Sequence, residues 1–133
     1  MAKSTWVLKA SVFSALRRAW RNSPMVQACL KNAKSEYFET CKNGNKRRRV
    51  KFECASCKKS FARKGVNVDH IEPVIEIKTG FVSYDVYIDR LFCNSEGLQI
   101  LCKSCHGEKT KAENKVRRQI KKKTSTKTRR TKK

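Results

Sequence analysis

Two pairs of cysteines with the spacing of metal ligands stand far apart in the sequence. The first pair is Cys54 and Cys57, and the second is Cys102 and Cys105. A CxxC spacing lets a tight turn direct both thiolates at one tetrahedral ion, and four thiolates make a closed, structural zinc site. The spacing therefore predicts a zinc ion that joins two distant segments of the chain. A redox function stays open for either pair alone, although no thioredoxin-like βαβ pattern surrounds them.

The two histidines of the chain are both close to these cysteines in sequence. His70 follows Asp69 at the end of a short β-type run, VNVDHIEPV, at residues 66 to 74. A histidine beside a carboxylate is more often structural than catalytic, and that alternative stays open. However, His106 directly follows the predicted zinc ligand Cys105. Coordination of zinc would therefore bring the two histidines into the same neighbourhood.

The composition limits the partners that the chain can have. Its 133 residues, 38% of them hydrophobic, fit one domain with a modest core, so an additional staple is expected. The formal charge of +22 indicates a polyanionic partner, with nucleic acid as the leading candidate and an anionic membrane surface as the alternative. Nothing in the sequence supports the membrane, because it has no apolar run of about 18 residues and no pattern of a signal peptide.

Two helices are expected at the amino-terminal end. Apolar residues recur at helical spacing from Lys9 to about Arg21, which is typical of a packing helix. Ser23 followed by Pro24 has the pattern of an N-cap with proline at the first helical position. We therefore expect a second helix that runs toward Tyr37.

Two further segments are strongly basic. Residues 43 to 52 predict a turn and a strand that contains Arg47, Arg48 and Arg49. These arginines are candidates for phosphate contacts, and a solvated run of charge is the alternative. From about residue 119 onward the chain has eight Lys or Arg and no acid. This composition cannot form a core, so we expect a tail that is disordered when free.

The ordered set of CxxC, VDHIEPV and LQILCKSCHGEKT resembles the HNH endonuclease family, in particular the small cysteine-bearing HNH nucleases common in bacteriophages and mobile elements. The resemblance covers about residues 54 to 113. It implies an α+β fold with a ββα-metal core, whose strands lie near 66–70 and 98–101 and whose helix runs over about 103–121. The expected organisation is a helical basic segment at 1–48, a nuclease domain at 49–118 and a disordered Lys/Arg-rich tail at 119–133.

The same resemblance implies roles for three residues. His70 matches the general base that takes a proton from the attacking water. Asp69 matches the adjoining metal ligand, and His106 matches the histidine that binds the same ion from the start of the helix. That ion would bridge the scissile phosphate and stabilise the leaving 3′ oxygen. Mg²⁺ or Mn²⁺ is expected there, although the histidine ligand also allows Ni²⁺, Co²⁺ or Zn²⁺.

Charged residues on the predicted helix are candidates for the same site. Lys109 and Lys111 are expected to face phosphates, with solvated lysines as the alternative. Glu113 follows His106 by seven positions and could share its face. It would then contact the ion through water or pair only with Lys109.

The sequence departs from the family at one position. An asparagine usually stands directly before the Leu-Gln of the second strand, and here that position is Gly97. Asn94 is nearby, and we expect that it substitutes or that no substitute is needed. Because the family asparagine braces the loop that carries the general base, its loss would loosen His70 more than it would abolish metal binding.

The predicted function is a metal-dependent endonuclease that hydrolyses phosphodiester bonds in DNA, with duplex DNA as the expected substrate. One alternative is a non-catalytic, zinc-stapled module that binds nucleic acid. The other is a subunit that nicks only with a partner, such as phage or mobile-element machinery. We expect the chain in the cytoplasm, that of the host cell if a phage encodes it, where reducing conditions favour metal-bound over disulfide-bonded cysteines.

Overall fold

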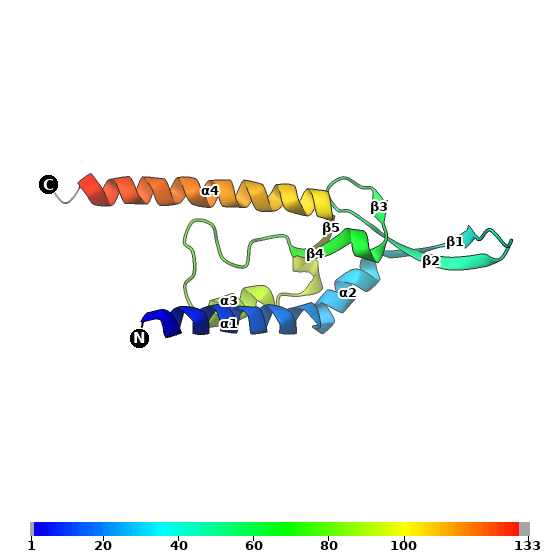
Figure 1. Cartoon of the computed structure of the whole chain (residues 1–133), viewed down its shortest axis with the longest axis horizontal. Coiled ribbons are helices and arrows are strands. Elements are labelled where there is room, and N and C mark those ends of the chain that lie inside the picture. The colour runs from blue at the N-terminus through cyan, green and yellow to red at the C-terminus, as the bar shows by residue number, and fades with distance from the viewer. Residues whose placement is uncertain (1, 131–133) are drawn as a thin grey trace.

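The computed structural model describes the backbone of residues 2–130 and the side chains of residues 9–125. In this part of the chain, two helices are followed by four strands, and a third helix, a fifth strand and a fourth helix come after them (Figure 1). The helices are α1 (Ala2–Arg21), α2 (Pro24–Ala33), α3 (Tyr84–Leu91) and α4 (Lys103–Arg130). The strands are β1 (Lys34–Thr40), β2 (Lys46–Glu53), β3 (Ser60–Phe61), β4 (Val66–His70) and β5 (Leu98–Cys102). The expected α+β class is confirmed.

The strands form two small antiparallel sheets. One sheet has the order β1-β2-β3, and the other pairs β4 with β5. In the second sheet Val66 lies opposite Cys102, and His70 lies opposite Leu98. Helix α4 begins directly after β5, so β4, β5 and α4 give the expected ββα order. One end of this short ribbon therefore carries a candidate zinc ligand, and the other carries the candidate base.

The hydrophobic core joins the amino-terminal helices to this ββα unit. Ser23 caps α2 by accepting a hydrogen bond from the amide of Val26, and Pro24 occupies the first turn, as expected. The apolar face of α2 then packs on β2, β4 and β5. The buried residues of this cluster are Val26, Cys29, Phe52, Val66, Leu98 and Ile100.

Helix α3 belongs to the long connection between β4 and β5. Tyr87 and Leu91 are both 2% exposed. The ring of Phe13, from α1, lies 4.8 Å from that of Tyr87, so α1 and α3 pack together through aromatic side chains. Tyr87 and Leu91 thus belong to the core, whereas Phe81 and Val86 are exposed.

Two boundaries differ from the sequence-based expectation. Helix α2 ends at Ala33 and not near Tyr37, because residues 34–40 are extended and pair with β2. Helix α4 continues to Arg130, so residues 119–130 are helical and not disordered, and residues 131–133 lie outside the described part. No glycine or proline follows Gly107, and Lys, Arg and Gln are good helix formers.

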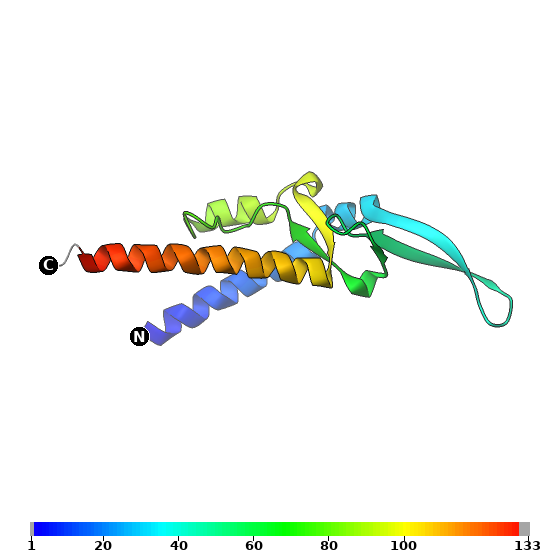
Figure 2. The same ribbon diagram turned by 90° about the horizontal axis from the view of Figure 1, so that it is seen from above.

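The elements give an elongated molecule (Figures 1 and 2). The β1–β2 hairpin projects from one end, while α1 and α4 extend toward the other. All residues of β1 are exposed, so the hairpin is in large part free of the body. Within the described residues, no helix is both long and apolar enough to cross a membrane.

Candidate functional site

The four cysteines of the two CxxC pairs come together in space. Their sulfur atoms all lie within 4.8 Å of one another, so the cluster is consistent with a structural zinc site. Cys54 directly follows β2, and Cys57 lies in the turn after it. Cys102 ends β5, and Cys105 lies in the first turn of α4. A bound ion would therefore tie the end of β2 to the junction between β5 and α4.

Backbone amides donate hydrogen bonds to two sulfur atoms of this cluster, which favours the thiolate form. The amide of Cys102 donates to Cys54 Sγ at 3.3 Å, and the amide of Cys105 donates to Cys102 Sγ at 3.4 Å. Burial disfavours ionisation of Cys54, but donors from Cys102, Cys57 and Ser56 outweigh it and lower its pKa to about 6. In contrast, the hydrogen bond with the Cys102 side chain raises the pKa of Cys105 to about 12. The donor set therefore needs a divalent cation before all its sulfurs can ionise together.

The other three cysteines lie outside the cluster. Cys29, on the buried face of α2, lies in the core, where burial raises the pKa of its thiol. Burial likewise raises the pKa of Cys93. Cys41 lies at the tip of the β1–β2 hairpin. For Cys29 this matches the expected role of a small buried hydrophobic residue.

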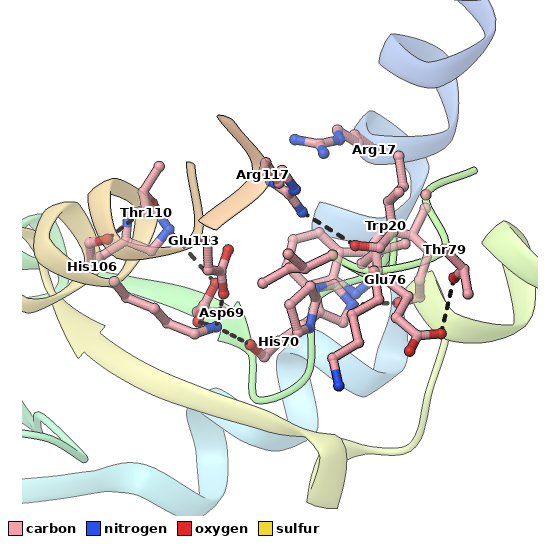
Figure 3. A pocket seen from close by; sticks show the side chains of 18 of the residues that line it. Arg17, Trp20, Asp69, His70, Glu76, Thr79, His106, Thr110, Glu113 and Arg117 are labelled. Carbon is pink, nitrogen blue, oxygen red and sulfur yellow. Dashed lines mark hydrogen bonds and ion pairs between the residues drawn. The ribbon is translucent and has the colours of Figure 1, made fainter. Parts of the chain in front are cut away.

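The three polar residues singled out between and after the cysteine pairs converge on one site (Figure 3). Asp69 and His70 end β4, and His106 lies in the first turn of α4, next to Cys105. Asp69 Oδ1 is 3.7 Å from His106 Nε2. Gln99, the β5 residue opposite Asp69, donates to Asp69 Oδ2 at 3.2 Å. The start of α4 thus places an imidazole nitrogen and a carboxylate oxygen close enough to share one cation.

These residues line a cavity of about 790 Å³. Its walls come from α1, from α4 and from the segment between β4 and α3. Arg117 of α4 donates to the carbonyl of Ile75, and Arg90 of α3 donates to that of Pro73, so two guanidinium groups hold the connecting segment in place. Further basic side chains line the cavity around the acidic centre, namely Arg17, Arg21, Lys78, Lys109 and Lys121.

His70 is buried and its orientation is fixed. Its ring Nε2 lies 2.8 Å from the carbonyl oxygen of Leu91. Because a carbonyl only accepts, Nε2 carries the proton and Nδ1 of the neutral ring is left as an acceptor. The indole of Trp20 stacks on the imidazole with ring centroids 4.5 Å apart. Burial lowers the pKa of His70 below its ordinary value.

Lys109 points into the site, whereas the sequence led us to expect it to face phosphates. Its Nζ lies 2.6 Å from Asp69 Oδ2 and also donates to the backbone carbonyl of His70. Glu113, one turn further along α4, pairs with the same ammonium at 3.3 Å, as its spacing allowed. The Lys109 ammonium thus forms an ion pair with one carboxylate oxygen of Asp69. Lys111 is exposed, as expected of a residue facing solvent or phosphate.

Asn94 does not join the site. It is exposed and is not among the residues that line the cavity. The loop after His70 is instead braced through the backbone, because the amide of Ile71 donates to the carbonyl of Gly97 at 3.0 Å. A Cβ at Gly97 would lie 2.9 Å from Cys93 Sγ, so an asparagine could not occupy this position without a shift of Cys93.

The arginines of the basic strand are remote from the cavity. Arg48 pairs with Glu36 at 2.7 Å, and Arg49 pairs with Glu39 at 2.8 Å, both across the hairpin. Arg47 is exposed and has no acidic partner among the described residues. These three residues therefore belong to a separate basic surface and not to the candidate site.

Two contacts to His70 were not predicted from the sequence, namely those with Trp20 and with the carbonyl of Leu91. Trp20 fitted the apolar periodicity of the first helix, and nothing in that spacing showed that its ring would cover an imidazole. The carbonyl of Leu91 is a backbone group that any residue has, so the residue type does not predict this contact. Both contacts depend on the path of the chain between β4 and β5.

Comparisons with known proteins give no relative. No protein-family model matches the chain, and searches of curated proteins and of solved structures find no match. The resemblance to the HNH family therefore rests on the motifs at residues 54 to 113 and on the expectations that they raise.

Replacement of one cluster cysteine should remove the zinc and with it the cooperative fold. Structural zinc contributes an apparent free energy of about 10 kcal/mol or more, which is comparable with the whole stability of a small domain. We therefore expect Cys102→Ser to bind no zinc and to lose its thermal unfolding transition, as measured by native mass spectrometry and circular dichroism. Cys41→Ser, at the hairpin tip, should retain both, and a zinc-loaded, stable Cys102→Ser protein would contradict the assignment.

Proposed function

We propose that this chain is a metal-dependent endonuclease of the HNH type that hydrolyses phosphodiester bonds in DNA. The observation that carries the proposal is the convergence of Asp69, His70 and His106 on one cavity with a basic rim. They come from the end of β4 and the start of α4, which is the ββα order that the motifs led us to expect. A module that only binds nucleic acid has no need of this arrangement.

His70 is suited to act as the general base. The neutral form dominates at neutral pH, because burial lowers its pKa. In this form Nδ1 can accept a proton from a water molecule while Nε2–H stays bound to the carbonyl of Leu91. That carbonyl and the face of Trp20 would both stabilise the imidazolium that results.

Asp69 and His106 are the residues that would hold a divalent ion. A carboxylate oxygen and an imidazole nitrogen suit Mn²⁺, Ni²⁺, Co²⁺ or Zn²⁺, and the carboxylate also suits Mg²⁺. When bound, such an ion neutralises charge on the scissile phosphate and on the leaving oxygen. Gln99 keeps Asp69 oriented by donating to Oδ2, which leaves Oδ1 toward His106.

The rim of the cavity fits the phosphates of a nucleic acid. Arg17 and Arg21 come from α1, while Arg117 and Lys121 come from α4, so positive charge lies on two sides of the acidic centre. Such contacts position the backbone without selecting a sequence, and they weaken as salt increases. We therefore propose DNA as the substrate with little dependence on base sequence at the cleft.

A second candidate function is a zinc-stapled module that binds DNA without cutting it. One observation favours it, namely that the Lys109 ammonium already neutralises Asp69 at 2.6 Å. If this ion pair persists when DNA is bound, the site would hold no divalent ion. The experiments below separate the two functions.

Nicking of supercoiled plasmid should require both an added ion and His70. We expect no cleavage by the zinc-loaded protein without an added divalent ion, and cleavage after addition of Mg²⁺, Mn²⁺ or Ni²⁺. His70→Ala should lower the rate by about 10²- to 10⁴-fold, the usual contribution of a general base. Asn94→Ala should cut at nearly the wild-type rate, because Asn94 lies outside the cavity. Plasmid that is retarded in a gel but uncut with every ion would instead support the binding module.

The pH dependence of nicking tests the state of His70. A lowered pKa keeps the imidazole neutral at a pH where an ordinary histidine, with a pKa of about 6.5, is half protonated. The rate should therefore be independent of pH at neutrality and should fall only as the pH drops below about 6.5. An acid limb centred at or above that value, measured in Mn²⁺ at constant ionic strength, would exclude the buried His70 as the base.

Removal of the Lys109 charge should strengthen binding of the divalent ion. Lys109→Met keeps the length of the side chain but frees Asp69 Oδ2 and Glu113 from the ammonium. We expect about tenfold tighter Mn²⁺ binding to the zinc-loaded protein, or about 1.4 kcal/mol, by isothermal titration calorimetry. Lys111→Met, on the same helix but exposed, is the matched control. Weaker Mn²⁺ binding by Lys109→Met would show that Lys109 orients Asp69 and does not compete with the ion.

A further inference from the structure

The β1–β2 hairpin is a large exposed feature that the candidate site does not use. Its strands pair without interruption from Lys34 opposite Phe52 to Thr40 opposite Lys46. Phe52 is buried and anchors the base of the hairpin in the core, while every residue of β1 is exposed. The ribbon therefore projects from the body on the side opposite the amino-terminal end of α1 and the carboxy-terminal end of α4 (Figures 1 and 2).

The free charge of the hairpin is positive and lies in its outer half. Residues 34 to 53 contain seven Lys or Arg and three Glu. Glu36 pairs with both Lys34 and Arg48, and Glu39 pairs with Arg49, so the two glutamates offset part of the charge at the base and middle of the hairpin. The basic residues nearer the turn have no acidic partner among the described residues, namely Lys42, Lys46 and Arg47. This surface is complementary to a polyanion.

One face of the ribbon combines this charge with an exposed aromatic ring. Phe38 is 71% exposed, more than any other large hydrophobic side chain whose position is described. It lies opposite Arg48, on the same face as Lys46, which is opposite Thr40. On the other face, Tyr37 is partly covered by Lys51, whose Nζ lies 5.5 Å from the ring centroid. The Phe38 face thus combines an exposed aromatic ring with Lys46, which has no acidic partner in the described part of the chain, and with Arg48, which is paired with Glu36.

We propose that the β1–β2 hairpin is a second DNA-contacting arm, which enters the major groove of duplex DNA. The major groove is about 12 Å wide and admits a two-stranded ribbon, whereas the minor groove is only about 6 Å wide. Strands of this kind rise about 3.3 Å per residue, so the paired part of the hairpin is long enough to cross the groove. Lys46 and Arg47 contact phosphates at its edge, and Phe38 packs on base edges such as the thymine methyl group.

The arm rests on the proposed DNA-directed function and adds to it a preference for duplex over single strands. The cleft contacts only the backbone, which both forms of DNA have. A two-stranded ribbon fits between the two sugar-phosphate backbones that border the major groove, and only duplex DNA has such a groove. The hairpin base is continuous with β2, which ends at the cysteine cluster, so the arm is held in a fixed relation to the cleft.

Binding of the zinc-loaded protein, measured in metal-free buffer with no added divalent ion and no chelator, tests the arm without cleavage. Fluorescence anisotropy would compare a plain duplex with one whose cytosines carry glucosylated hydroxymethyl groups, which fill the major groove, and with a plain duplex saturated with the minor-groove ligand netropsin. We expect glucosylation to weaken wild-type binding at least tenfold and netropsin to change it less than twofold. Equal affinity for the glucosylated duplex, or competition by netropsin, would overturn the proposal.

Three variants connect this effect to the hairpin. Phe38→Ala should bind the glucosylated and plain duplexes with nearly equal affinity, because the group that reaches the bases is gone. Arg47→Ala should lower the slope of log affinity against log salt by about one phosphate contact, whereas the paired Arg49→Ala should change it less. A Phe38→Ala protein that still discriminates against glucosylation would place the groove contact elsewhere and overturn the proposal.

The experiments can reject the proposed DNA-contacting arm and the proposed nuclease activity independently of each other. If wild-type protein shows the groove effect without an added divalent ion but fails to nick plasmid with every ion tested, the arm stands and the nuclease is lost. If it nicks plasmid and the hairpin variants bind like wild type, the nuclease stands and the arm is lost.

Discussion

The convergence of four thiols at the junction of β2, β5 and α4 is the constraint on which the rest of the structure depends. The core is small, and the two CxxC pairs are far apart in sequence, so a tetrahedral ion bound here would supply a long-range connection that hydrophobic burial supplies only weakly. Because Cys105 directly precedes His106, the same connection fixes where α4 starts and which way its first turn faces. The distance between His106 and Asp69 is therefore set by the cluster as much as by the β4–β5 pairing.

The chemistry of the proposed site depends on groups outside the ββα unit. His70 gains its orientation from the carbonyl at the end of α3 and from an indole of α1, and its low pKa follows from the burial that these elements provide. The loop after it is held by the backbone of Gly97 and not by an asparagine side chain. The amino-terminal helices thus share the core with the site, and a fragment that begins near residue 49 would lack part of what shapes the base.

Local patterns predicted the parts of this structure that local forces determine. The meeting of the two CxxC pairs followed from ligand geometry, and the N-cap at Ser23 followed from capping preferences. The positions of β4, β5 and the start of α4 match those that the resemblance to the HNH family implied. The positions of Asn94 and Lys109 did not follow, because each depends on a turn or side-chain direction that only the folded chain sets. Residues 119–130 have few core-forming residues, and this composition predicted disorder. Their high helix propensity instead lets α4 continue to Arg130.

The stacking of Trp20 on His70 also limits how this sequence can change over evolutionary time. Positions 20 and 70 belong to different elements, yet substitution of either alters the burial and direction of the same imidazole. A change at either position alone would alter the basicity of the ring, so we expect positions 20 and 70 to change together among related sequences. Helix α1, which has the composition of a simple packing element, therefore also shapes the surroundings of the proposed general base through Trp20.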